Sequence, residues 1–277
     1  QNLALHGYTV SLVERSSLLG GQARSLFKTW QGEDVQQNLR ELLEAVESDP
    51  NIRIHLETEV SKVEGFVGKF KSTLRSGSKE EILDHGIAVI ATGAEEHKPE
   101  EYHYGHDPRV LTHLELDEKL LRHDPLFRDI RSAVFIQCVG SREPERPYCS
   151  KVCCTHSIGS ALHLKELRPD MNITIHYRDI RTYGEREYLY RNARLAGVAF
   201  IQYASDRKPE ITPKEEGLEI EVMDQNLGQT VRMRADLLVL ASAVVPHRNE
   251  HLAQLFKIPV NEEGFFVEAH AKLGPSE

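Results

Sequence analysis

The chain has 277 residues and a formal net charge of −9, and 40% of its residues are hydrophobic. It is long enough to bury one large core or two ordinary domains. The lack of a basic block argues against a nucleic-acid surface and against a polybasic membrane contact. No apolar run approaches the roughly 18–20 residues that span a bilayer, and no signal-peptide pattern opens the sequence. We therefore expect a soluble cytoplasmic protein with no nucleic-acid partner and no membrane span.

The two ends of the sequence are typical of a fragment of a longer protein. The chain opens at Gln1 without a methionine, and residues 1–7 resemble the second half of a helix. It stops shortly after Lys272-Leu273-Gly274-Pro275. We expect further residues of the same protein on both sides.

The first part of the chain alternates strand and helix signals. The helix is bounded by Gly32 and Pro50, as helix punctuation predicts. Residues 87–90 are continuously apolar, which is typical of a strand buried on both faces of a parallel sheet. In order, the expected elements are a strand at 8–14, a helix at 33–48, strands at 52–55 and 59–63, a β-hairpin at 70–74 and 80–83, and a strand at 87–90.

A second pattern of the same kind follows. Its expected elements are a strand at 133–137, a helix at 150–167, a strand at 173–177, a helix at 185–196, and strands at 198–201, 218–222, 231–234 and 237–240. The repeated order predicts an α/β fold with two Rossmann-like dinucleotide-binding modules, the second inserted in the first. We assign 1–120 to the first module and 121–247 to the second. Residues 248–277 begin the return to the first, and the connection between modules is expected within 100–124.

The first module carries candidate cofactor contacts. Glu14 ends an apolar strand, where an acid of a dinucleotide site binds ribose hydroxyls, and the glycine turn that usually precedes it would lie upstream of Gln1. Gly20 and Gly21 allow close backbone approach to a cofactor. Taken alone, Glu14 is equally well explained as a solvated carboxylate and the glycine pair as a plain turn. The full set of expected cofactor-binding residues is Glu14, Arg15, Gly20, Gly21, Gln22, Val60, Ala91, Thr92 and Gly93.

All four cysteines of the chain fall in one short segment of the second module. Cys138, Cys149, Cys153 and Cys154 form the pattern C-x10-C-x3-C-C, and Cys138 follows the first strand where a nucleotide-binding module has its glycine turn. Thiolates are ligands for zinc or iron–sulfur clusters. Structural zinc sites usually use C-x2-4-C pairs, and the adjacent cysteines fit a larger cluster better. Disulfides are disfavoured in the cytosol, and the C-x-x-C motif of redox dithiols is absent. Zinc stays an alternative at this point.

Several segments resemble one known family. Residues 134–142 and 146–154, which hold the cysteines, resemble the cysteine signature of the A subunit of heterodisulfide reductase and its relatives. Residues 177–184 are similar to the stretch that follows in that family, and Gly264-Phe265-Phe266-Val267-Glu268 is similar to its return to the flavin domain. The resemblance covers nearly the whole chain. The first module is similar to flavoproteins of the thioredoxin-reductase type.

The resemblance implies an FAD-dependent oxidoreductase subunit with a four-iron, four-sulfur (4Fe-4S) cluster held by the four cysteines. Such a subunit relays electrons between FAD, the cluster and partner redox subunits. The implied partners are other heterodisulfide-reductase-type subunits and a redox module such as ferredoxin, hydrogenase or formate dehydrogenase, with a homodimer as a further option. Electron-bifurcating relatives often have a lysine five residues after the last cysteine, where this chain has Gly159, which argues against bifurcation but not against electron transfer. The chain also lacks the cysteines that extra ferredoxin-type domains would need.

One alternative from a different functional class remains open at this point. The chain could be a non-catalytic scaffold or interaction module that has no flavin and keeps a structural zinc site. A visible spectrum distinguishes the two, because flavin and iron–sulfur centres absorb visible light and zinc does not.

Overall fold

The computed structural model describes residues 1–267, so Glu268 and the rest of 268–277 lie outside the described residues. The chain divides into two compact units. Unit 1 comprises Gln1–Arg24, Asp34–Glu95 and Pro246–Glu277, and unit 2 comprises Ser25–Glu33 and Glu96–Val245. Unit 2 therefore interrupts unit 1 in sequence, as the expected insertion of one module in the other requires. Residues 96–120, which the sequence pattern grouped with the first module, lie in unit 2.

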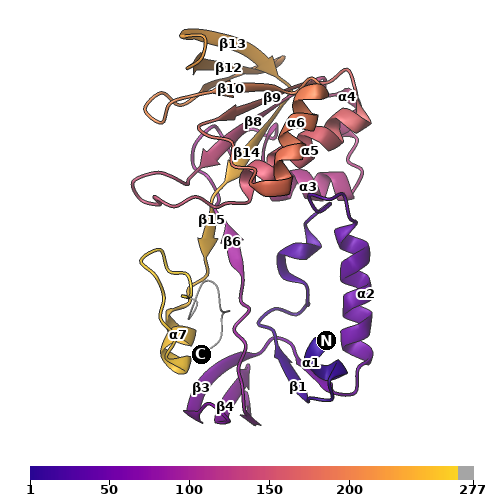
Figure 1. The fold of residues 1–277 in the computed structure, drawn as a ribbon, viewed down its shortest axis with the longest axis vertical. Helices are drawn as coiled ribbons and strands as arrows, with labels where there is room; N and C mark the ends of the chain where they lie inside the picture. Colours follow the sequence, from indigo (N-terminus) through magenta and orange to yellow (C-terminus); the bar gives the residue numbers. More distant parts are fainter. Residues whose placement is uncertain (268–277) are drawn as a thin grey trace. The chain divides into compact units, whose positions relative to one another are not determined.

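Unit 2 is built around a five-stranded parallel sheet in the order β10-β9-β8-β14-β7 (Figure 1). Its central strands are almost wholly apolar, because both faces of a parallel sheet are covered. The five strands are β7 (Val110–Thr112), β8 (Ser132–Val139), β9 (Asn172–Tyr177), β10 (Ala199–Gln202) and β14 (Leu237–Ser242).

Three layers make up unit 2. Helices α3 (His113–Leu121), α5 (Cys153–Leu167) and α6 (Glu187–Leu195) lie together on one side of the parallel sheet (Figure 1). Their apolar side chains form one buried core with Phe135 and Ile175 of the sheet. An antiparallel sheet covers the other face and forms the second core. Its strands are β11 (Glu210–Lys214), β12 (Gly217–Asp224) and β13 (Gln229–Ala235).

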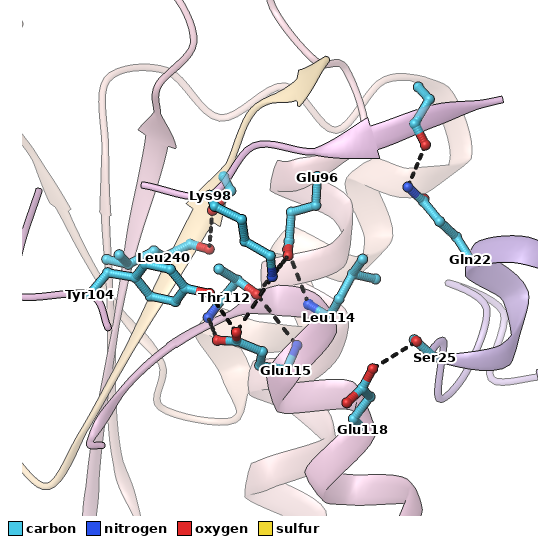
Figure 2. Close-up of polar contacts among 12 residues, drawn as sticks. Gln22, Ser25, Glu96, Lys98, Tyr104, Thr112, Leu114, Glu115, Glu118 and Leu240 are labelled. Atoms are coloured by element: carbon cyan, nitrogen blue, oxygen red, sulfur yellow. Dashed lines mark hydrogen bonds and ion pairs between the residues drawn. The ribbon is translucent and has the colours of Figure 1, made fainter. Parts of the chain in front are cut away.

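The segment 100–124, within which the connection between the modules was expected, contains both β7 and α3. Thr112 caps α3 because its hydroxyl accepts from the Glu115 N–H at 3.4 Å, while the Glu115 carboxylate accepts from the Thr112 N–H at 2.9 Å. The Thr112 hydroxyl also donates a hydrogen bond to the Glu96 carboxylate at 2.7 Å, and Lys98 Nζ lies 3.0 Å from the same carboxylate (Figure 2). The Thr-x-x-Glu spacing is a capping-box pattern, so the sequence did carry a signal for this helix.

Unit 1 has a much smaller parallel sheet, in which β1 (Val10–Val13) pairs only with β2 (Ile52–His55). The expected helix is α2 (Val35–Ser48), which begins where the Asp34 side chain accepts from the Gln37 N–H. A three-stranded antiparallel sheet follows. The remaining elements of unit 1 are α1 (Asn2–Leu5), η1 (Gly21–Arg24), β3 (Glu59–Phe66), β4 (Lys69–Ser76), β5 (Lys79–His85) and α7 (Glu250–Phe256).

Short elements complete the chain: α4 (Leu126–Asp129), η2 (Gly184–Arg186), and the two-stranded sheet of β6 (Ala94–Glu96) and β15 (Val244–Pro246). Among the described residues, every helix is too short or too polar to traverse a lipid bilayer.

The expected buried strand at 87–90 is wrong. These residues are not in a strand, and the side chains of Ile87 and Val89 are 77% and 74% exposed. An apolar run becomes a strand only when a neighbouring strand satisfies its backbone hydrogen bonds. Among residues 1–267, the parallel sheet of unit 1 offers it no such neighbour, because β1 and β2 pair only with each other.

Candidate functional site

The cysteines lie at the carboxyl-terminal edge of the unit 2 sheet, which is the edge where α/β folds bind ligands. Cys138 is near the end of β8, and Cys153 and Cys154 begin α5. Cys153 and Cys154 pack against Ala241 near the end of β14. The Cys154 thiol also lies 3.7 Å from the Asp179 carbonyl oxygen, just after β9. Residues far apart in the sequence are thus brought to one edge.

The turn after β8 has unusual backbone geometry. Cys138 and Arg142 have φ angles of 63° and 58°, in the left-handed region that residues with a side chain rarely adopt. Lys151, within the second cysteine loop, has φ 65°. Such conformations persist only where the surrounding structure imposes them, and they cluster at functional sites.

The four thiols are free, and three of them are buried. Cys138, Cys153 and Cys154 are each 4% exposed, whereas Cys149 is half-buried. Burial raises the pKa of the Cys138 thiol, with a further contribution from the nearby Cys154. The four thiols therefore form a buried cluster that opens toward the surface only at Cys149.

The adjacent cysteines share one hydrogen bond. The bond from Cys153 lowers the pKa of Cys154 to about 7. Burial alone would raise this pKa, whereas the Arg181 backbone N–H and guanidinium lower it further. The same bond, followed by burial and by the charges of the other three cysteines, raises the pKa of Cys153 well above its usual value. The other three thiols are therefore near enough to Cys153 for their charges to disfavour its ionised form.

Arginines surround this cluster. Arg142 Nη1 lies 3.9 Å from Cys138 Sγ, and its other terminal nitrogen lies 2.7 Å from an Asp179 carboxylate oxygen. Arg178 is 7% exposed and forms an ion pair with Glu143, which Lys208 also contacts at 3.0 Å. Positive charge next to thiols stabilises their ionised form.

The donor set fits a cluster of soft metal ions in its chemistry. Four thiols meet at one edge, arginines offset their charge, and the start of α5 has no side-chain cap on its amide groups. Free amides at a helix start can donate to cluster sulfurs. Within residues 1–267, no three Cys, His, Asp or Glu side chains already stand in a finished metal-ligand arrangement. The fit thus rests on the type and gathering of the donors.

In unit 2, side chains lie beside the turn after β8, where an ordinary dinucleotide site has a glycine turn with open space. A Cβ added to Gly140 would lie 2.3 Å from the His97 ring. Arg146 donates to the Gly140 carbonyl oxygen at 2.7 Å and lies 3.0 Å from His97 Nε2. Burial and Arg146 lower the pKa of His97. The space beside this turn is filled by the chain itself.

Some of the expected cofactor residues of unit 1 lie close together. Gln22 Nε2 donates to the Ala94 carbonyl oxygen at 2.5 Å, which links the glycine pair to the segment 91–94 (Figure 2). A Cβ added to Gly21 or Gly93 would meet nothing within 4 Å, so the backbone at both positions is open. This bare backbone fits the close approach of a dinucleotide.

The other expected cofactor residues are placed by local contacts. Glu14 Oε1 accepts from the N–H and the hydroxyl of Ser16, at 2.7 and 2.8 Å. Gly20 packs against Leu39, and the Thr92 hydroxyl lies 3.5 Å from Asn249 Oδ1. The last three are Arg15 and Ala91, which are exposed, and Val60, which pairs with Leu74 between β3 and β4.

The structure also contains a buried polar chain that sequence reasoning missed. The Gln137 amide donates to Ser157 Oγ at 2.5 Å, and Ser157 Oγ lies 2.7 Å from His113 Nε2. His156 Nε2 lies 3.1 Å from the buried carboxylate of Asp117. These side chains tie α3 and β8 to the first turns of α5 below the cysteines. The signal available in the sequence was a polar residue, Ser157, among the apolar residues of the helix predicted at 150–167.

The chain is similar to known proteins in sequence and in fold. No family model matches the chain. The iron-sulfur A subunit of CoB–CoM heterodisulfide reductase from Methanocaldococcus jannaschii is 28% identical over 99% of this chain and 56% of its own length. The second A subunit of the same reductase from Methanopyrus kandleri is 34% identical over 69% of this chain and 31% of its own length. The chain belongs to the family of heterodisulfide reductase A subunits.

This family member spans only about half, or less, of the length of the curated relatives it matches. The alignment with the Methanocaldococcus protein extends over 368 positions although the chain has 277 residues, so that relative has additional residues inside the aligned region.

The fold is that of thioredoxin-reductase-like flavoproteins. Thioredoxin reductase from T. acidophilum superposes with a TM-score of 0.60 at 13% identity, over 99% of this chain and 81% of that chain. A copper complex of a mutant of the flavoprotein disulfide reductase RclA from Escherichia coli gives a TM-score of 0.59 at 16% identity. That match covers 100% of this chain and 60% of the reductase.

Proposed function

We propose that this chain is an electron-transfer subunit of a heterodisulfide-reductase-like oxidoreductase in the cytoplasm, with a 4Fe-4S cluster at Cys138, Cys149, Cys153 and Cys154. The observation that carries the proposal is the gathering of all four thiols at the carboxyl edge of the unit 2 sheet. The relatives' names support it, since one is called an iron-sulfur subunit and another a subunit of a heterodisulfide,ferredoxin reductase.

The residues around the thiols would bind the cluster and control its charge. When bound, such a cluster takes up and releases single electrons, and FAD exchanges one or two. Arg142 lies beside Cys138, and the Arg181 backbone N–H lies beside Cys154. Both would stabilise thiolates and favour the more reduced, more negative state. Burial of three thiols would keep water from the ligands.

For FAD, we propose a site in unit 1 at Glu14, Arg15, Gly20, Gly21, Gln22, Val60, Ala91, Thr92 and Gly93. The open backbone at Gly21 and Gly93 and the Gln22 bridge support this assignment. We also propose that unit 2 does not bind NAD, because His97 and Arg146 fill the space beside its first turn.

The cluster assignment is tested by metal analysis of anaerobically purified protein. We expect about four iron atoms per chain, with a broad visible absorption. Cys153→Ala should lower the iron content, because it removes a buried ligand. Ser157→Ala is the matched control, since it changes a neighbouring α5 residue that offers no thiol. Stoichiometric zinc without iron would instead favour a structural metal site.

A further inference from the structure

One side of the cysteine cluster reaches the surface. The cysteine-loop face consists of Lys151, Val152, Arg181 and Tyr183. Lys151 is exposed, Val152 and Tyr183 are 52% and 59% exposed, and the Arg181 side chain is 35% exposed. All four residues belong to unit 2.

This face lies directly over the thiols. The Lys151 N–H donates to Cys149 Sγ at 3.4 Å. The Arg181 guanidinium is near enough to the Cys149 thiol and to Tyr183 for their charges to interact with it. The backbone between β9 and α6 contacts Cys154 through the Asp179 carbonyl oxygen. A protein that binds here would therefore reach the cluster by its least buried ligand.

The charge of the face differs from that of the whole chain. Asp179 is the acid beside it, and it is bridged by Arg142 at 2.7 Å and by Arg181 at 3.5 Å. Exposed Lys151 and half-buried Arg181 therefore leave the face locally positive on a chain whose net charge is −9. An acidic partner would be repelled by most of this protein and attracted here, which is how charge steers protein association.

We propose that the cysteine-loop face is the docking site of an acidic one-electron carrier protein. Exposed Val152 and Tyr183 supply the apolar and aromatic contact at the centre of such interfaces, and Lys151 and Arg181 supply the charged contacts. The identification of the carrier as a one-electron donor or acceptor rests on the proposed cluster. The docking surface itself belongs to the folded chain.

The test measures binding of a small, oxidised, acidic ferredoxin to the full chain by titration calorimetry at low ionic strength. We expect saturable binding that weakens steeply with salt. The double variant Lys151→Glu, Arg181→Glu should weaken it by about tenfold or more. Lys214→Glu is the matched control, because it reverses an exposed charge on β11 of the antiparallel sheet, and it should change affinity by less than about twofold.

Binding and metal content are measured on the same preparations, so the two proposals can fail separately. Ferredoxin binding without iron in the chain would leave the docking site in place and remove the electron-transfer role. Iron without binding, or equal weakening in the double variant and in Lys214→Glu, would overturn the docking site. Equally tight binding of a basic c-type cytochrome would also overturn it, because the charge argument would then be wrong.

Discussion

The two units of this chain both combine a parallel sheet with helices and an antiparallel sheet, but they differ greatly in how much they bury. Unit 2 has a five-stranded parallel sheet covered on both faces and contains both large cores. Unit 1 has a two-stranded parallel sheet, and its buried apolar side chains among the described residues are Ala4, Val46, Leu74 and Ala253. A shared sequence pattern thus gives comparable elements without comparable cores.

The difference shows what an apolar run requires. Ile175 and Ile87 both come from segments that the sequence pattern predicts to be strands, 173–177 and 87–90. Ile175 has β8 and β10 on either side and is fully buried, whereas Ile87 lies outside any strand and is 77% exposed. Whether an apolar residue is buried therefore depends on the strands that pair with its segment. The following experiments test this contrast between unit 1 and unit 2.

The largest expected effect is the difference in free energy of unfolding between alanine substitutions of Ile175 and Ile87. Ile175→Ala should lower the free energy of unfolding by about 2–5 kcal/mol, because it removes buried methyl groups and leaves a cavity. Ile87→Ala should change it by no more than about 0.5 kcal/mol, because the side chain is already in water. Urea unfolding of both variants measures the contrast. Equal losses would mean that residues 87–90 are packed against a partner in solution.

A second contrast is acid sensitivity, which the buried histidines of unit 2 should produce. Burial lowers the pKa of His176 to about 4, and neither ring nitrogen has a hydrogen-bond partner among the described residues. The unfolded chain therefore binds the proton more readily, so stability is lost as pH falls from about 6.5 toward 4. The loss should reach about 3 kcal/mol. Burial also lowers the pKa of His113, which acts in the same direction.

The measurement is urea unfolding of the wild type and His176→Leu between about pH 7.5 and about pH 4.5, a range that spans most of this transition. The variant should lose most of this pH dependence, and the exposed control His106→Leu should keep it. A pH profile of His176→Leu identical to that of the wild type would mean that His176 is accessible to protons in the folded chain.

A smaller contrast concerns the helix caps. Thr112→Ala should cost about 1–2 kcal/mol, because Thr112 is buried and its hydroxyl bonds both the Glu115 N–H and the Glu96 carboxylate. Asp34→Ala in unit 1 should cost about 0.5–1 kcal/mol, because it breaks one exposed cap bond. Thr112→Ser should restore stability in urea unfolding. The reverse order of the two losses would show that unit 1 controls global unfolding.

The smallest expected effect is a gain in stability when Gly159 of α5 is replaced by alanine. A Cβ added there meets nothing within 4 Å, and alanine is the better helix former. Gly159→Ala should raise the free energy of unfolding by about 0.5–1 kcal/mol. Gly140→Ala is the contrasting control and should destabilise, because of its φ of 71° and the His97 ring. A loss at Gly159 would indicate that something packs there in the folded protein.

Much of the fold could be predicted from local pattern. Residues 133–137 and 173–177 are strands β8 and β9, and residues 150–167 contain α5, as the sequence pattern predicted. The helix at 113–121 was missed although its capping box is visible in the sequence. The strand expected at 87–90 was wrong because pattern alone does not supply a neighbour.

The sequence alone predicted that the four cysteines act together, because they all fall within one short segment. It also identified the family through that segment. Only the tertiary structure brought Asp179 and Arg181 to Cys154, and His97 to the turn at Gly140. These contacts join residues far apart in the chain, and they form because parallel strands β8, β9 and β14 end at the same edge. Local periodicity encodes each strand, whereas the choice of neighbours depends on burying all of them at once.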